Sequence, residues 1–494
     1  MRGGGISTKE EGSSASIRRV APTSQDPASA SGAAADDRPV SFGEAFRFWL
    51  KLGFINFGGP AGQIAIMHRE LVERHRWVGE AQFLRALNFC MILPGPEAQQ
   101  LATYIGWRLH GYRGGLVAGA FFVLPSVFVL LVLSWLAAAY GDVPAVQGLL
   151  YGVGPVVIAL VVDALLRIAG RTLGHPLLVG FAFAAFAAIY ALGLLFPVVV
   201  GAAALAGLLL SRRWPDVFRA RTHGSGGWAS EAVSETGSGP ASVTENGAVS
   251  ATASGPGNPS AMELRRPSLR RSAAVAAIFV LLWAVPFGAL LAWRGAGDVL
   301  VHEFLFFTQT ALVTFGGAYA VLAYIAEVAV NQFGWLDAQQ MIQGLALAES
   351  TPGPLIMVTQ YVGFFGAYQL AGEYPPLLNG VLGGLVTTYA TFLPSFLFIF
   401  LMAPYIELLA DARLLQAALV GVTAAVVGVI ANLAVFFTTR VLFPGVVSVG
   451  GLDLLALAIA LFSFAILRRT RVPVHVLVPI GALVGLVAAV TGLV

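Results

Sequence analysis

The chain contains one sequence pattern twice, and this duplication constrains its fold more than any other feature. A first set of motifs recurs at an ungapped spacing of 258 residues: Phe57-Gly58-Gly59 with Phe315-Gly316-Gly317, Trp77 with Trp335, Gln82 with Gln340, and Pro94-Gly95-Pro96 with Pro352-Gly353-Pro354. A second set recurs at a spacing of 269: Gly114-Gly115-Leu116 with Gly383-Gly384-Leu385, Leu124-Pro125-Ser126 with Leu393-Pro394-Ser395, and Asp163 with Asn432. The change of spacing predicts a longer loop near Glu373–Pro376. Repeats interrupted by Gly and Pro at equivalent places are typical of transporters with a shared central site.

The composition places the chain in a lipid bilayer. Of 494 residues, 57% are hydrophobic and 11% are charged, and the mean hydropathy is +0.78. A water-soluble globular protein of this length does not have such a composition. Against the roughly 20 residues that a crossing helix needs, the predicted apolar stretches are Leu116–Ala139, Gly148–Leu166, Leu177–Leu192, Ala273–Trp293, Leu377–Ala403, Leu414–Phe437, Leu452–Leu467, Val474–Leu493 and the shorter Leu194–Leu210.

Composition also divides the chain into segments. Residues 1–40 are rich in Ser, Ala and Gly without an apolar signal-peptide core, and residues 211–271 are rich in Gly, Ser, Pro and Ala. Both are predicted to be disordered, the second as a cytoplasmic linker. The predicted repeats occupy 41–210 and 299–494, with one connecting transmembrane helix at 272–294. The single cysteine, Cys90, excludes an intrachain disulfide.

The distribution of arginine predicts that the two repeats have opposite orientations in the membrane. Basic residues collect on the cytoplasmic side of short loops. In the first repeat they cluster at 68–85, 108–113 and 167–171, whereas the second-repeat counterpart of the first cluster, 327–340, has none and Arg468–Arg471 are basic instead. The sequence therefore predicts two inverted-topology repeats in an all-α polytopic membrane protein, with Ala273–Trp293 as the odd crossing.

The same orientation predicts re-entrant, broken helices within each repeat. If the loops at 68–85 and 108–113 face one side, Phe42–Met67 and Phe83–Trp107 must each enter and leave on that side. Their turns are Gly-Gly-Pro and Pro-Gly-Pro, which end one helix and start another. Irregular backbone at membrane depth persists only where protein buries it or where it lines a cavity. Whether each segment is a hairpin or two crossings is left open by hydropathy.

These breaks predict a site for an anion. Pro96 and Pro354 occupy the expected first helical position, so each new helix would direct free N–H groups and its positive dipole end into the protein. The glycines would let backbone amides approach a small ligand. The predicted substrate-binding residues at the breaks are Asn56, Phe57, Gly58, Gly59, Pro94, Gly95, Pro96, Phe315, Gly316, Gly317, Pro352, Gly353 and Pro354.

A few charged residues in apolar segments complete the predicted site. Arg47 and Lys51 lie one helical turn apart and could supply positive charge, although basic side chains near a membrane surface also snorkel towards water. Glu97, Glu349 and Asp163 are the candidates for proton coupling, because carboxylates within a membrane are costly and often mark ion pathways. Glu97 could instead cap a helix, and Asp163 could hydrogen-bond a neighbouring helix.

Several other chemistries find no support in the sequence. The seven histidines are scattered without metal-ligand spacing. There is no phosphate-binding Gly-Lys-Ser/Thr loop and no Gly-x-Ser-x-Gly elbow. We therefore expect neither an enzyme nor a nucleic-acid-binding protein, and no cofactor or metal.

With these motifs in order, the chain resembles the long, two-domain members of the chromate ion transporter family. The resemblance rests on Phe57–Pro60, Leu93–Pro96 and Leu124–Ser126, with their second copies at Phe315–Gly317, Thr351–Pro354 and Leu393–Ser395, and it covers residues 42–493. It implies a secondary transporter that expels chromate from the bacterial cytoplasm across the inner membrane, uses the proton motive force and confers chromate resistance. Ala318 in place of Pro60 and Leu355 in place of Glu97 make the repeats chemically unequal.

Alternatives remain open at this level. A sulfate or general oxyanion transporter has the same requirements, because sulfate and chromate are similarly shaped dianions. A passive anion channel and a membrane-bound sensor that recruits a partner through the linker are further alternatives. The direction of transport, its stoichiometry, the coupling carboxylate and assembly as a homodimer are not fixed by the sequence.

Overall fold

The computed structural model describes residues 40–218, 268–315, 317–406, 413–444, 449–470 and 472–493. These residues form helices and connecting turns, without a β-strand in the ranges given. The helical elements are α1 Phe42–Ile55, α2 Gly59–His68, η1 Arg69–Arg74, α3 Glu80–Ile92, α4 Glu97–Tyr140, α5 Pro144–Thr172, α6 Pro176–Tyr190, α7 Phe196–Ser211, α8 Pro215–Phe218, α10 Leu269–Arg294, α11 Val299–Leu312, α12 Ala318–Ala326, η2 Glu327–Gln332, α13 Ala338–Ser350, η3 Leu355–Met357, α14 Val358–Gln369, α15 Pro376–Met402, η4 Ala403–Tyr405, α17 Arg413–Leu442, η5 Val449–Gly451, α18 Leu454–Arg469 and α19 Val474–Val490.

The two repeats fold into the same order of elements, which confirms the duplication. α1, α2 and α3 correspond to α11, α12 and α13, with a break after the first helix of each set. Even an uncommon feature recurs: α2 and α12 each continue into one turn of π-helix, η1 and η2, at positions that differ by the same 258 residues. Since π-turns are rare, their repetition at equivalent positions is strong evidence that both halves share one fold.

The repeats differ at the place where the sequence predicts a longer loop. In the first repeat α4 runs from Glu97 to Tyr140 and is interrupted only by a kink, where His110 and Gly111 leave helical torsion angles. In the second repeat the equivalent helix ends at Gln369, and α15 begins at Pro376. The inserted residues therefore open the kink into a loop.

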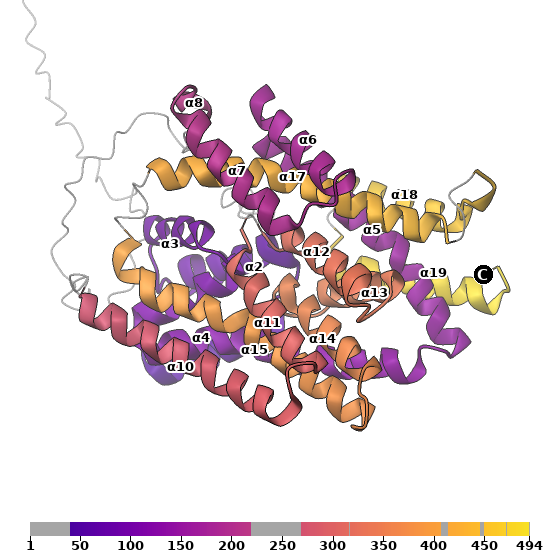
Figure 1. The fold of residues 1–494 in the computed structure, drawn as a ribbon, viewed down its shortest axis with the longest axis horizontal. Helices are drawn as coiled ribbons and strands as arrows, with labels where there is room; N and C mark the ends of the chain where they lie inside the picture. The colour runs from indigo at the N-terminus through magenta and orange to yellow at the C-terminus, as the bar shows by residue number, and fades with distance from the viewer. Residues whose placement is uncertain are drawn as a thin grey trace, which may run out of the picture.

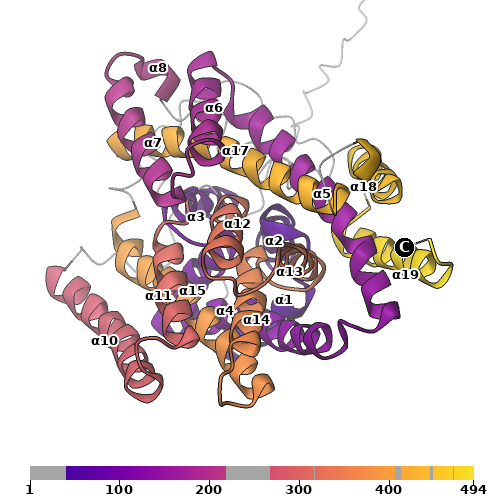
Figure 2. The same ribbon diagram turned by 45° about the vertical axis from the view of Figure 1, so that its right-hand side comes forward.

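The repeats are joined by an exchange of their long helices. α5 of the first repeat packs against α18 and α19 of the second, and α17 of the second packs against α6 and α7 of the first (Figure 2). Glycine permits close backbone contact at both crossings. A Cβ on Gly152 would lie 2.0 Å from the carbonyl oxygen of Gly481, and a Cβ on its counterpart Gly421 would lie 2.5 Å from that of Ala203. Each repeat thus lacks a complete packing surface without the other.

The remaining helices form the body that this exchange surrounds. α1–α4 and α11–α15 pack together, with α4 in contact with both α14 and α15 of the other repeat. In Figure 1 the unpaired helix α10 lies along the edge of this body, on the side away from α18 and α19. Only 17% of its most apolar window is buried, as expected of a helix whose main neighbour is lipid.

The lengths of the helices agree with a multi-pass membrane protein. Five of the described helices are long and apolar enough to cross a bilayer: Glu97–Tyr140, Pro144–Thr172, Leu269–Arg294, Pro376–Tyr405 and Leu414–Leu442. The other four predicted crossings, α6, α7, α18 and α19, contain 15 to 17 residues. They are shorter than the roughly 20 residues of a full perpendicular crossing, and three of the four predicted apolar stretches are themselves only 16 or 17 residues long.

The predicted tail and linker fall mostly outside the described residues. Residues 1–39 and 219–267 are not described. Within the predicted linker the structure places the end of α7 and the short helix α8, whose Phe218 is buried against Leu178 and Ala417. The folded part of the first repeat therefore extends beyond its predicted end at residue 210.

The close crossing of α5 and α19 gives a stability prediction. Gly152→Ala should lower the thermal stability of the detergent-solubilised protein, by about 1–3 kcal/mol, because its methyl group overlaps the Gly481 carbonyl. Gly180→Ala in α6 is the control, since no heavy atom lies within 4 Å of a Cβ there, and should be neutral or slightly stabilising. Equal unfolding temperatures for Gly152→Ala and wild type would contradict the packing.

Candidate functional site

The first break of each repeat uses glycine to end one helix and start the next. After α1 ends at Ile55, Gly58 and Gly59 have φ values of 93° and 67° and lead into α2. Gly317, with φ 98°, precedes α12 in the second repeat. These values lie in the region that glycine adopts readily and other residues rarely do. Gly316 lies outside the described residues.

The second break of each repeat follows the same rule. Gly95 and Gly353 have φ values of 127° and 119°, and each is followed by a proline that starts a helix. Pro96 is the N-cap of α4 and Pro354 is the N-cap of η3, which continues into α14. The expectation that both prolines occupy the first helical position is therefore wrong by one residue. The N–H groups of the first turn still have no acceptor within the helix.

The breaks of the two repeats pair with each other, because each repeat satisfies the broken backbone of the other; we call these paired breaks the junction. The N–H of Gly95 donates to the carbonyl oxygen of Thr314 at 2.9 Å, and the N–H of Gly353 donates to that of Asn56 at 2.8 Å. Asn56 and Thr314 are equivalent positions of the two repeats. Gln63 adds a hydrogen bond from its Nε2 to the Gly353 carbonyl oxygen at 2.6 Å. The Pro-Gly-Pro turn of one repeat is thus held by the Phe-Gly-Gly segment of the other.

Two serines complete this reciprocal arrangement. A Cβ on Gly95 would lie 2.7 Å from the hydroxyl oxygen of Ser395, and a Cβ on Gly353 would lie 2.8 Å from that of Ser126. These serines belong to the equivalent Leu-Pro-Ser motifs in α15 and α4. Each Pro-Gly-Pro turn therefore rests on a serine of the other repeat, at a position where only glycine fits.

The junction contains buried polar atoms that no described residue satisfies. The hydroxyls of Ser126 and Ser395, both amide atoms of Asn56, and the amide oxygens of Gln63 and Gln100 have no hydrogen-bond partner. Leaving such groups unpaired costs free energy, and orphaned groups in a native structure call for an explanation. Hydroxyls and amide N–H groups beside free helix N-termini can donate hydrogen bonds to an oxyanion.

Two carboxylates face the junction from opposite repeats. The Oε1 atom of Glu97 lies 3.7 Å from a Cβ placed on Gly317, and the Oε2 atom of Glu349 lies 4.0 Å from a Cβ placed on Gly59. Glu349 also accepts a hydrogen bond from the Tyr319 hydroxyl. The structure therefore brings both predicted carboxylates to the Phe-Gly-Gly segments, each to the segment of the other repeat.

Asp163 has a different environment. Its carboxylate forms ion pairs with Arg167 at 3.0 Å and with Arg468 of α18 at 3.1 Å. α5, which carries Asp163 and Arg167, also packs against α13, which carries Glu349. The predicted proton-coupling residue is thus part of an ion-pair cluster that joins the two repeats, and this cluster lies beside the junction.

The predicted cations Arg47 and Lys51 are not brought to the junction. Both are exposed on α1, whose buried face is formed by other residues, among them Phe48, Trp49 and Leu52. The helical spacing correctly placed them on one face, but that face points away from the core. Arg85 of α3 is likewise exposed.

Sequence reasoning missed two kinds of functional candidate. Ser126 and Ser395 were visible as repeated motifs, but their approach to the Pro-Gly-Pro turns of the opposite repeat depends on the tertiary fold. Glu303 of α11 is fully buried with both carboxylate oxygens unpaired, pressed against Gly366 and Gly383. The sequence did contain a sign of this residue, since the equivalent position of the first repeat is the uncharged Ala45.

The arrangement is suited to binding a small ligand. The described residues contain no group of three or more His, Cys, Asp or Glu side chains that could hold a metal ion. The junction offers hydroxyls, amides and helix N-termini, with two carboxylates at its margin. Such a set can bind a small oxyanion and can make its binding depend on protonation.

Comparison with known proteins agrees with this description. The chromate transporter family model matches residues 43–208 and 301–486, one match in each repeat. A chromate transport protein from Pseudomonas aeruginosa is 30% identical over 79% of this chain and 80% of its own length. A chromate transport protein from Cupriavidus metallidurans is 26% identical over 89% and 92%, and a probable chromate transport protein from Synechococcus elongatus is 28% identical over 78% and 82%. No solved structure matches the chain.

The serines at the junction give a prediction that separates binding from folding. Ser126→Ala and Ser395→Ala should leave thermal stability unchanged or raised, because each removes an unpaired buried hydroxyl. Each should weaken chromate binding roughly tenfold through the loss of a hydrogen bond to a charged ligand. The measurement is the rise in unfolding temperature of the purified protein with chromate concentration.

A matched control exists in the same helix. The Ser134 hydroxyl of α4 is also buried without a partner, so Ser134→Ala tests removal of a similar hydroxyl two turns beyond Ser126. It should leave stabilisation by chromate unchanged. If the two junction variants respond to chromate as strongly as wild type and Ser134→Ala do, the serines do not bind the ion.

Proposed function

We propose that this chain, which belongs to the chromate transporter family, is a secondary transporter that exports chromate across the bacterial inner membrane, uses the proton motive force and thereby confers resistance to chromate. The observation that carries the proposal is the junction of four helix breaks, where paired repeats leave the Ser126 and Ser395 hydroxyls unsatisfied. The names of the relatives supply the identity of the ion.

The geometry supports a tetrahedral oxyanion as the ligand. Oxyanion oxygens accept hydrogen bonds in several directions, and both repeats offer donors: one hydroxyl from α4, one from α15, the Asn56 amide and the first N–H groups of the helices after the breaks. The positive ends of helix dipoles add favourable potential without a fixed cation. A site without a permanently charged partner can also release a dianion readily.

The membrane potential supplies a direction. The cell interior is negative, so the free energy of a dianion falls when it leaves the cell. The fall is about 4.6 kcal/mol for each 100 mV of membrane potential, at about 2.3 kcal/mol per charge. The electrical part of the proton motive force therefore drives chromate outwards. It continues to do so as long as fewer than two protons accompany each dianion, because net negative charge then crosses the membrane.

Glu97 and Glu349 link this process to protons. A dianion bound at the junction repels an ionised carboxylate on either side, so binding is stronger when these groups are protonated. Linkage is reciprocal, and chromate binding should therefore take up protons. Tyr319, as the hydrogen-bond donor to Glu349, would hold that carboxylate in place as its charge changes.

Inverted orientation of the repeats remains part of the proposal. Its support is the reciprocity of the contacts: Gly95 with Thr314 and Gly353 with Asn56, and the exchange of helices around α5 and α17. Contacts of this kind relate two similar halves through an approximate two-fold axis. The reversed distribution of arginine suggests that this axis lies in the membrane plane.

The test is chromate flux into inside-out membrane vesicles, in which export appears as accumulation. A lumen-positive potential imposed with K⁺ and valinomycin should drive saturable accumulation, and lower pH should reduce the KM. The double variant Glu97→Gln/Glu349→Gln should abolish most of this pH dependence while retaining potential-driven flux. Vesicles with the Arg47→Gln/Lys51→Gln variant are a control for general charge effects, since both residues are exposed.

Other outcomes identify the alternatives. Strong inhibition by excess sulfate would indicate a general oxyanion transporter. Flux that neither saturates nor depends on pH would indicate a passive channel. The absence of accumulation under every gradient would refute chromate export by this chain.

A further inference from the structure

Equivalent positions on α5 and α17 have different surroundings: ion pairs fill the space at one, and a cavity lies at the other. Asp163 in α5 corresponds to Asn432 in α17, and Arg167 corresponds to Phe436. At the first position the chain forms a cluster of ion pairs. At the second it forms a cavity of about 390 Å³ that Asn432 and Phe436 help to line.

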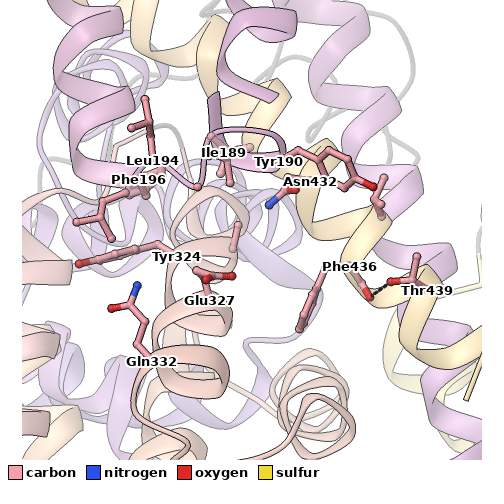
Figure 3. Close-up of a pocket in the computed structure, with 15 residues that line it drawn as sticks. Ile189, Tyr190, Leu194, Phe196, Tyr324, Glu327, Gln332, Asn432, Phe436 and Thr439 are labelled. Atoms are coloured by element: carbon pink, nitrogen blue, oxygen red, sulfur yellow. Dashed lines mark hydrogen bonds between the residues drawn. The ribbon is translucent and has the colours of Figure 1, made fainter. Parts of the chain in front are cut away.

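The cavity has a definite set of walls (Figure 3). One wall is α17, with Asn432, Phe436 and Thr439; the second is the connection between α6 and α7, from Ile189 to Phe196; and the third is α12 with η2. Tyr324 and Glu327 belong to this third wall. α12 begins directly after Gly317 of the junction and lines the cavity with the residues at its opposite, C-terminal end.

The ion-pair cluster lies among the elements that correspond to the walls of the cavity: α5 corresponds to α17, and α18 and α19 correspond to α6 and α7. Asp163 lies on α5, and Arg468 lies in the last turn of α18, before the connection to α19 that corresponds to the connection between α6 and α7. His475, at the start of α19, contacts Phe57 of the first Phe-Gly-Gly segment, with ring centroids 5.1 Å apart. On the cavity side Phe196 stacks with Tyr324 at 5.6 Å. The first turns of α19 and of α7 therefore each contact the first broken segment of the opposite repeat.

We propose that these two places are the two ends of one route for the oxyanion: the cavity at Asn432 is an open outer vestibule, and the Asp163–Arg167–Arg468 cluster is the closed inner gate. This inference rests on the proposed function and adds the route by which the ion reaches the junction. The structure then represents the outward-open conformation of the transporter. The gate opens when α18 and its connection to α19 move away from α5 and the Arg468 ion pair breaks.

The charges at the two ends fit export. Arg167, Arg171, Arg468 and Arg469 lie at the gate end, and a basic surface raises the local concentration of an anion. None of the described residues that line the vestibule is basic, and Glu327 is its one carboxylate. The inner end, with four arginines, therefore attracts a dianion more strongly than the outer end, where Arg440 lies over the ring of Phe436 at 5.8 Å. α5 connects the gate with the junction, because it also packs against α13, which carries Glu349.

The experiment compares two equivalent positions as single-cysteine reporters, Tyr324→Cys at the vestibule and Ile66→Cys at the gate end, 258 residues apart. Both are made in a Cys90→Ala background, since Cys90 is buried and free. A membrane-impermeant thiol reagent is applied to right-side-out and inside-out vesicles of the full chain. Tyr324→Cys should react from outside, and Ile66→Cys should react slowly from the cytoplasmic side.

Breaking the gate should change these rates in opposite directions. Asp163→Asn gives the gate the residue found at the vestibule, and should speed cytoplasmic labelling of Ile66→Cys roughly fivefold, as expected for the loss of partly exposed ion pairs. It should slow labelling of Tyr324→Cys by a shift towards the inward-open form. Arg468→Gln should reproduce both effects. Arg469→Gln, which alters the neighbouring exposed arginine, should change neither.

Two results would overturn the gate. One is equally fast labelling of Ile66→Cys with and without Asp163; the other is unchanged rates at both reporters in Asp163→Asn and in Arg468→Gln. Labelling of both reporters from one side would overturn the inverted orientation as well. These readouts do not require transport, so altered accessibility without chromate flux would refute the proposed substrate and leave the gate supported.

Discussion

The structure depends on one constraint: backbone groups freed by a helix break inside a membrane need partners from elsewhere in the protein. Here the partners come from the other repeat, since Gly95 donates to Thr314 and Gly353 donates to Asn56. Neither repeat can form its breaks alone at an acceptable cost. The exchange of helices around α5 and α17 follows from the same requirement, because it holds the two sets of breaks against each other.

This mutual dependence also explains why the junction suits a ligand. The backbone hydrogen bonds fix the Pro-Gly-Pro turns, and the glycines at their centres bring the turns close to Ser126 and Ser395. The serine hydroxyls are then buried without a partner, and the proposed binding site rests on them. The repeats differ in their carboxylates, Glu97 in one and Glu349 in the other, so one approximately symmetric frame carries an asymmetric site.

The sequence predicted the parts of this account that depend on local chemistry. Helix breaks follow from the torsional freedom of Gly and the missing donor of Pro, and the change from a kink at His110 to a loop before Pro376 follows from the eleven inserted residues. It could not predict non-local contacts. Helical spacing placed Arg47 and Lys51 on one face without indicating that this face is exposed. The local spacing of Asp163 and Arg167 could not indicate the second ion pair of Asp163, because its partner Arg468 is 305 residues away.

The central claim is that an oxyanion binds between the two repeats, at the serines. The most direct measurement is a structure of the protein with chromate, in which anomalous scattering locates the chromium atom. The account predicts one chromium site at the junction, with chromate oxygens within hydrogen-bonding distance of Ser126 and Ser395. A chromium site beside the exposed Arg47 and Lys51, with the junction empty, would contradict it.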